Sequence, residues 1–132
     1  MIPTYAKMLL AATLTYTACL ANATGQNLSP AAREAFARGQ RAQQAGDGVN
    51  AVRAFGEAIQ LCPNIAELYV ARAEAHRSAG QLGQALADCT EAIRRKPKLA
   101  VAYVARANAW TGKGDLEKAI ADSTIAIGIE PR

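Results

Sequence analysis

The sequence AELYVARAEAHRSAGQLGQALADCTEAIRRKPKL, residues 66–99, governs how this chain folds, because its pattern occurs three times. A step of 34 residues in either direction meets the same or a similar residue in seven columns, far more often than chance would give. The columns are Arg38, Arg72 and Arg106; Gly46, Gly80 and Gly114; Ala51, Ala85 and Ala119; Val52, Leu86 and Ile120; Ala58, Ala92 and Ala126; Ile59, Ile93 and Ile127; Pro63, Pro97 and Pro131. We therefore divide the chain into repeats over residues 32–65, 66–99 and 100–132.

Each repeat predicts two helices joined by a glycine turn. Apolar residues recur at three- and four-residue spacing over residues 66–79 and again over residues 82–95. Gly80 follows the first helix, where a glycine commonly ends one, and Pro97 prevents the second from continuing. The chain is 51% hydrophobic with many alanines, and it lacks the short alternating runs typical of strands. These features predict an all-α fold of antiparallel helix pairs, which must stack because isolated helices of this length are marginal in water.

Small residues recur where the two helices of a repeat are expected to cross, which lets their axes approach closely. The facing positions are Gly39 and Ala51, Ala73 and Ala85, and Ala107 and Ala119. A small rotation from each pair to the next predicts a short superhelix with a concave inner face.

The 34-residue period resembles the tetratricopeptide repeat (TPR), whose pattern is Trp-x2-Leu-Gly-x2-Tyr, then Ala-x3-Phe and Pro. The matching columns are Ala35, Tyr69 and Tyr103; Arg38, Arg72 and Arg106; Gly39, Ala73 and Ala107; Ala42, His76 and Trp110; Ala51, Ala85 and Ala119; Phe55, Cys89 and Ser123; Pro63, Pro97 and Pro131. The resemblance covers residues 32–132 and implies an α-solenoid, a right-handed superhelix of three helix–turn–helix repeats.

The main departure from the TPR pattern is arginine in its leucine column. We expect Arg72 to pair with Asp88, and Arg106 with Asp122, across the two helices of a repeat. The first repeat has Ala54 at the acidic position, so we expect it to lack this pair. Such pairs serve helix register more reliably than stability.

The resemblance also implies a function, because in proteins of this family the first helix of each repeat lines a groove. It predicts a non-enzymatic module that binds a peptide or helix of another protein. The expected groove residues are Arg33, Phe36, Gln40, Gln43, Glu67, Val70, Glu74, Arg77, Val101, Val104, Asn108 and Thr111, above a floor of Ala37, Ala71 and Ala105.

One known activity of the family is not expected here. Some TPR domains bind the terminal carboxylate of a chaperone through Lys, Asn and Arg at five groove positions. The matching residues are Phe36, Gln40, Ala71, Val101 and Ala105. None of them is a cation or an asparagine, so we expect no carboxylate clamp.

The N-terminal segment reads as an export signal. Lys7 is its one charge, residues 8–18 form a short apolar run, and Ala21-Asn22-Ala23 fits a small-x-small cleavage site. The pattern predicts a signal peptide over residues 1–23, a lead-in over 24–31 and a bacterial exported protein that is periplasmic or secreted.

Two alternatives to cleavage after Ala23 stay open. Cys19 stands where a lipoprotein cysteine would, which would make the chain a structural or assembly subunit of an envelope complex, and an uncleaved anchor is the other alternative. The mature chain would begin at Thr24 or at Cys19, and contact with a membrane is expected only if the chain is lipidated or uncleaved.

The sequence offers no set of residues for catalysis, for metal or for a cofactor. His76, the single histidine, lies in a column where these repeats pack an aromatic side chain. The net charge of +4 is scattered rather than gathered on one face, so we expect no nucleic-acid partner. Cys62 and Cys89 are expected on different helices, where packing residues are favoured over a disulfide.

The C-terminal helix, expected over residues 116–129, has no helix after it in this sequence. Ile125 and Ile129 are therefore expected to be bare. An exposed apolar patch commonly marks a contact surface. We expect this end to self-associate or to dock on a larger assembly.

Overall fold

The computed structural model describes residues 28–130, and within them every regular element is an α-helix. The helices are α2 (Pro30–Gln44), α3 (Gly48–Leu61), α4 (Ala66–Ser78), α5 (Leu82–Arg95), α6 (Ala100–Lys113) and α7 (Leu116–Ile129). None of these helices is long and apolar enough to cross a membrane. The predicted signal segment over residues 1–23, with its cleavage point and Cys19, lies outside the described residues.

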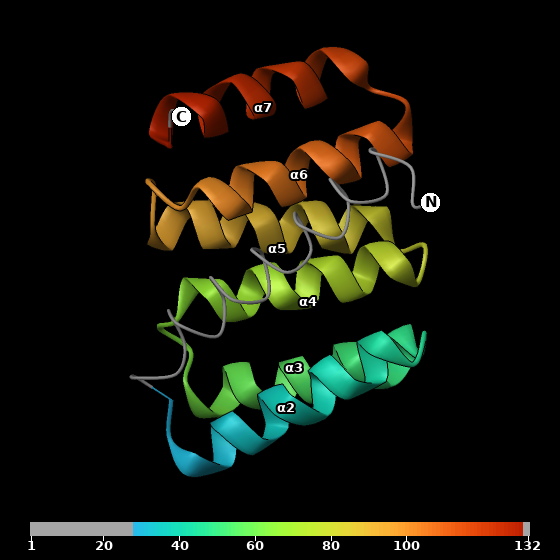
Figure 1. Ribbon diagram of the computed structural model, residues 1–132, viewed down its shortest axis with the longest axis vertical. Helices are drawn as coiled ribbons and strands as arrows, with labels where there is room; N and C mark the ends of the chain where they lie inside the picture. Colours follow the sequence, from blue (N-terminus) through green and yellow to red (C-terminus); the bar gives the residue numbers. More distant parts are fainter. Residues whose placement is uncertain (1–27, 131–132) are drawn as a thin grey trace, which may run out of the picture.

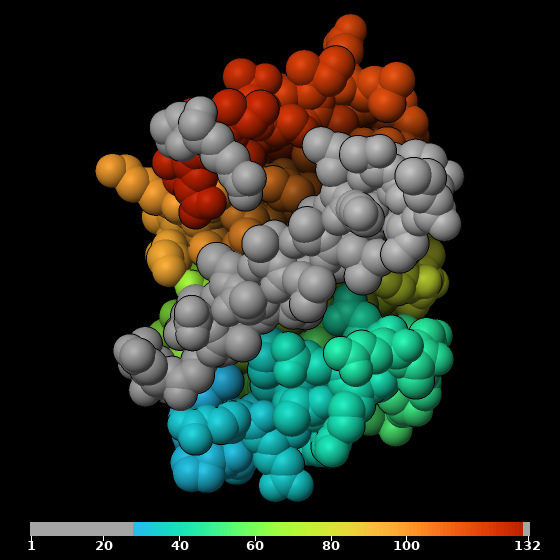
Figure 2. All heavy atoms as spheres, viewed as in Figure 1, coloured from blue at the N-terminus to red at the C-terminus, as the bar shows by residue number. Residues whose placement is uncertain are grey.

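The helices pack as three sequential pairs, α2 with α3, α4 with α5 and α6 with α7 (Figure 1). The second helix of each pair also contacts the first helix of the next, and α4 contacts α6 directly. The space-filling view shows the first and last pairs at opposite ends of the stack (Figure 2). The predicted all-α fold of three helix–turn–helix repeats is confirmed.

The three turns inside the repeats share one backbone geometry. Gly46, Gly80 and Gly114 follow the first helices with φ of 77°, 78° and 83°, a left-handed conformation that glycine adopts without steric cost. The next residue donates its N–H to a carbonyl five residues back, as Gln81 does to His76 at 2.8 Å. This is the Schellman ending of a helix, and it turns the chain into the second helix of the pair.

Side-chain hydrogen bonds of two kinds fix where helices begin. Ser29, Asp47 and Asp115 each accept a hydrogen bond from the backbone N–H three residues later, which caps α2, α3 and α7. The Tyr69 hydroxyl donates to the carbonyl of Pro63, and the Tyr103 hydroxyl to that of Pro97. These bonds tie each proline-containing turn to the helix that follows it.

The core is built largely from alanines, with a few larger side chains between them. Phe55, Leu68, Val70 and Cys89 are the largest fully buried side chains. In the first repeat the crossing position is Gly39, and a Cβ there would lie 2.5 Å from Cε1 of Phe55. The aromatic ring of Phe55 therefore occupies the volume that a methyl group at position 39 would need, whereas the later repeats have alanine at this position, Ala73 and Ala107.

The predicted ion pairs across the second and third repeats are confirmed. Arg72 donates through Nε and Nη2 to the two carboxylate oxygens of Asp88, at 2.8 and 2.7 Å. Arg106 meets Asp122 in the same bidentate way, at 2.8 Å for both bonds. The hydrogen bond that each arginine donates to its aspartate is the main cause that raises the pKa of the arginine.

The first repeat differs from what we expected. Arg38 lacks an acid at the Ala54 position, but it does find a partner: its Nη2 lies 2.6 Å from Oε2 of Glu57, one helical turn further along α3. Both side chains of this pair are more than two fifths exposed, so water weakens it.

Candidate functional site

The candidate site is the face of α2, α4 and α6 formed by the twelve predicted groove residues, hereafter the A-helix face. Its members differ in exposure along the stack. Phe36 and Val70 are buried and belong to the hydrophobic core, and Glu67 and Glu74 are also buried. The accessible members are therefore found mainly at the two ends of the face.

The third repeat contributes the most accessible part of the A-helix face. Val104 is 43% exposed, Asn108 and Thr111 are exposed, and Val101 is half-buried. The three exposed side chains follow at four- and three-residue spacing, which places them along one side of α6. The Thr111 hydroxyl donates to the carbonyl of Ala107 at 2.9 Å. A partner segment lying along α6 would therefore meet one apolar and two polar side chains.

The second repeat contributes two carboxylates, each paired with a cation from this chain. Oε1 of Glu67 lies 2.8 Å from Nζ of Lys96, and Oε2 of Glu74 lies 2.9 Å from Nη2 of Arg77. The two acids are largely withdrawn from water, whereas the two cations are exposed. The first repeat adds exposed Arg33 and half-buried Gln40 and Gln43. The face is thus mixed in charge rather than basic.

Helix α7 carries the second candidate surface. Ile125 is exposed as expected, but Ile129 is half-buried rather than bare. The sequence prediction missed three residues that are barer, which lie on the other side of the helix: Leu116 at 60%, Ile120 at 67% and Ile127 at 67% exposure. The signal was available in the repeat columns, because Ile120 and Ile127 belong to columns whose other members pack against the core.

The histidine and the cysteines of the described residues, which could in principle be reactive, are held by hydrogen bonds or by packing. Nδ1 of His76 lies 2.7 Å from Oε1 of Gln81, and its Nε2 lies 3.6 Å from Oδ2 of Asp88. Cys62 and Cys89 are free thiols, and burial is the first cause that raises the pKa of Cys89 to about 12. Within residues 28–130, no three His, Cys, Asp or Glu side chains are grouped to hold a metal.

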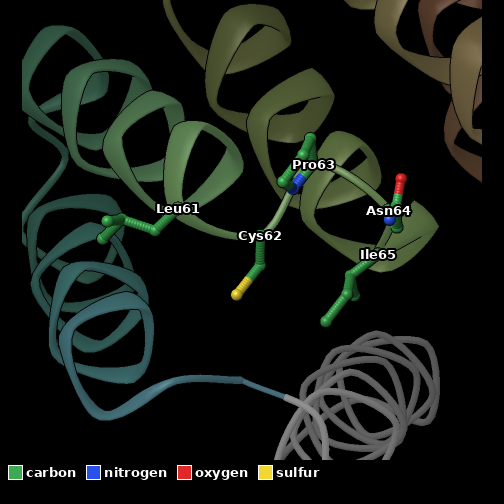
Figure 3. Close-up of a pocket in the computed structure, with 5 residues that line it drawn as sticks. All are labelled: Leu61, Cys62, Pro63, Asn64 and Ile65. Carbon is green, nitrogen blue, oxygen red and sulfur yellow. The ribbon is translucent and has the colours of Figure 1, made fainter.

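A small pocket lies at the turn between α3 and α4, lined by Leu61, Cys62, Pro63, Asn64 and Ile65. In Figure 3 the side chains of Cys62 and Ile65 extend to one side of the turn and that of Asn64 to the other. Cys62, a free thiol, is the one ionisable side chain among these five residues.

We compared the sequence and the structure with those of known proteins. Neither a family model nor a curated protein matches the sequence. Solved structures do match it. The TPR2B domain of yeast Sti1, in complex with pHsp70, is 30% identical with a TM-score of 0.74, over 77% of this chain and 82% of that one. The Arabidopsis OM64 TPR domain is 31% identical with a TM-score of 0.73, over 76% and 84%.

A third structure shows a peptide in such a domain. The second TPR of Spaghetti (RPAP3), bound to the HSP90 peptide SRMEEVD, is 26% identical with a TM-score of 0.71, over 76% of this chain and 94% of that one. Given its three helix pairs, its 34-residue period and its identity to the Sti1 and OM64 domains, this chain belongs to the tetratricopeptide-repeat family.

Proposed function

We propose that this chain is a non-enzymatic protein-interaction module whose A-helix face holds a peptide or helix of a partner protein. The observation that carries the proposal is the exposed Val104, Asn108 and Thr111 strip along α6. Such a strip offers an apolar anchor point flanked by hydrogen-bonding groups, which suits an extended peptide or an amphipathic helix. The complexes of Sti1 with pHsp70 and of RPAP3 with an HSP90 peptide support the use of this fold for that purpose.

The chemistry of the A-helix face argues for a partner without an acidic tail. Its five positions that match the carboxylate clamp are Phe36, Gln40, Ala71, Val101 and Ala105, and they supply no cation. Glu67 and Glu74 add negative charge that is already matched within the chain. At these five positions an incoming carboxylate would lose its hydration and meet no cation, which costs free energy. We infer a partner segment with small apolar anchors that is neutral or basic.

The peptide SRMEEVD tests this inference directly. Its C-terminal carboxylate and its three acidic side chains should find no cation at the five clamp positions, so we expect no saturable binding up to about 1 mM in isothermal titration calorimetry. The second TPR of RPAP3, which was solved with this peptide, serves as the positive control. Saturable binding to this chain below about 100 μM would contradict the inferred partner chemistry.

The A-helix face itself is tested by Val104→Glu. The partner is first captured by crosslinking from native extract, and its affinity is then measured with purified proteins. A charge at the apolar anchor should weaken binding about 10- to 100-fold. Phe36 and Val70 are unsuitable for this test because they belong to the core, and their replacement would unfold the chain.

The matched control is Val49→Glu on α3, where the native valine is exposed and lies off the A-helix face. It introduces the same charge without touching the proposed site. Both variants should show the helical circular dichroism of the wild type. Equal affinities of the partner for the wild type and for Val104→Glu would exclude the A-helix face as the binding surface.

A further inference from the structure

The chain enters its first described helix beside the A-helix face. Leu28, the first described residue, is buried and belongs to the hydrophobic core. Its carbonyl accepts a hydrogen bond at 3.3 Å from Nη2 of Arg33, a residue of the A-helix face. The hydroxyl of Ser29 lies 3.9 Å from Sγ of Cys62, just before α4 begins. The part of the chain that precedes Leu28 is therefore joined to the stack at the edge of this face, close to the start of α4.

Helix α4 is enclosed on the side that belongs to the A-helix face. Residues 66–71 are all buried, and six consecutive residues go more than once round a helix. Arg72 marks the side toward α3 and α5, because it bonds Asp88 of α5 and its Nη1 would lie 3.8 Å from a Cβ at Gly56 of α3. Val70 lies about 200° round the helix from Arg72 and is nevertheless fully buried. Cover on that side comes from the neighbouring first helices or from residues outside the described range.

The same chain contains a segment with the chemistry that we infer for the partner. Residues 1–27 include no acid, and Lys7 is their one charged side chain. Residues 8–20, MLLAATLTYTACL, are hereafter the N-terminal run; they carry no charge, and leucine and alanine supply seven of the thirteen. The run lies outside the described residues, so the match is one of sequence chemistry. It is the neutral segment with small apolar anchors that suits a face without cations at its clamp positions.

The length of the segment also suits the face. Residues 21–27 connect the N-terminal run to Leu28 and span at most about 25 Å. Thirteen residues cover about 20 Å as a helix and about 45 Å when extended. Neighbouring packed helices lie about 8–10 Å apart, so the distance from α2 across α4 to α6 is about 20 Å. In either conformation the run is long enough to cross the A-helix face.

We propose that the N-terminal run binds the A-helix face of its own chain and competes there with the partner protein. The inference rests on the proposed function, because it assigns an internal competitor to the same surface. A short flexible connection gives the run an effective concentration of about 1 mM. A dissociation constant of only about 100 μM would then keep the face occupied in about nine molecules of ten. Cleavage after Ala23 would release the run and free the face.

Photo-crosslinking in the full chain tests the contact. Benzoylphenylalanine takes the place of Val104, which is exposed on the A-helix face, and the chain is irradiated at about 1 μM, where intramolecular contact dominates. We expect a crosslink within one chain to a fragment that contains residues 8–20, identified by mass spectrometry. The same group in place of Val49, an exposed valine of α3, is the matched control and should not reach the run.

A charged variant of the run tests its specificity. Leu10→Glu with Leu14→Glu places two carboxylates in the run and should lower the crosslinking yield at least about tenfold, because they would lose hydration on a face without cations at its clamp positions. Thr24→Glu with Gln26→Glu puts the same charges in the connection and should leave the yield unchanged. No crosslink from position 104 to residues 8–20, or a yield that Leu10→Glu with Leu14→Glu does not lower, would overturn the proposal.

The affinity of the captured partner separates this proposal from the proposed function. The full chain with Leu10→Glu and Leu14→Glu should bind the partner about tenfold more tightly than the wild type, because its face is no longer occupied. A partner that is lost with Val104→Glu but binds both full-length chains equally would refute the competition and leave the proposed function standing. A crosslink from position 104 to the run, together with a partner that Val104→Glu does not affect, would support the contact and refute the proposed function.

Discussion

Replacing Arg72 by methionine should lower the free energy of unfolding by about 3 kcal/mol, the largest effect we expect from one change of charge. The reason lies in the partner that remains. Asp88 is only 9% exposed at its side chain and accepts both bonds from the guanidinium, so its carboxylate would stay buried without a cation at bonding distance. Urea denaturation followed by circular dichroism gives the free energy, and the melting temperature should fall by about 15 °C.

Two further variants separate burial from charge. Arg38→Met removes the equivalent arginine of the first repeat, whose partner Glu57 is 43% exposed and remains hydrated when it is left alone. That change should cost no more than about 0.5 kcal/mol. The double variant Arg72→Met with Asp88→Leu should recover most of the loss, because an apolar pair of similar volume needs no counter-charge. Equal costs for Arg38→Met and Arg72→Met would contradict this account.

These pairs also show how far the sequence could predict the structure. Arg72 with Asp88, and Arg106 with Asp122, followed from the repeat because both columns face the line where the two helices cross. Arg38 with Glu57 did not follow, because a long flexible side chain can reach an acid one turn away and no column marks that choice. A period therefore predicts which helix faces meet but not every partner of a long side chain.

Exposure is the property that the repeat pattern predicts least well. Ile120 is two thirds exposed, whereas Leu86 in the same column packs against the core, because α5 has a helix stacked on it and α7 has none among the described residues. Phe36 and Val70 occupy columns assigned to the groove, yet both are buried. The repeat column predicts the direction in which a side chain points, whereas its burial depends on whether another helix or side chain packs against it.

The glycine turns were predictable for a physical reason. A helix that ends in a left-handed backbone conformation favours glycine there, because glycine adopts that conformation at little steric cost. Glycine recurs at this position as Gly46, Gly80 and Gly114. The binding role of the A-helix face is different, because a ligand leaves no periodic trace in a single sequence. It rests on the family resemblance and on the exposed residues of α6, and Val104→Glu tests it.

Gly39→Ala should destabilise the chain by about 2 kcal/mol although alanine is the better helix former. The added methyl would lie 2.5 Å from a ring carbon of Phe55, and that ring is fully buried with its centroid 5.5 Å from that of Phe36, so it cannot move aside without displacing other core residues. Chemical denaturation measures the loss. Gly56→Ala in α3 is the matched control: its new methyl meets nothing closer than 3.8 Å and should stabilise by about 0.5 kcal/mol.

The residues at this crossing change together from one repeat to the next. Where the first helix has Gly39, the ring of Phe55 lies against it. Where the first helix has alanine, at positions 73 and 107, the column of Phe55 holds the smaller Cys89 and Ser123. Phe55→Cys alone should cost about 3 kcal/mol by leaving a cavity. With Gly39→Ala added, the total should stay near 3 kcal/mol rather than reach about 5, because the methyl then enters space that the ring has left. Strict additivity of the two losses would show that the volumes at this crossing are not coupled.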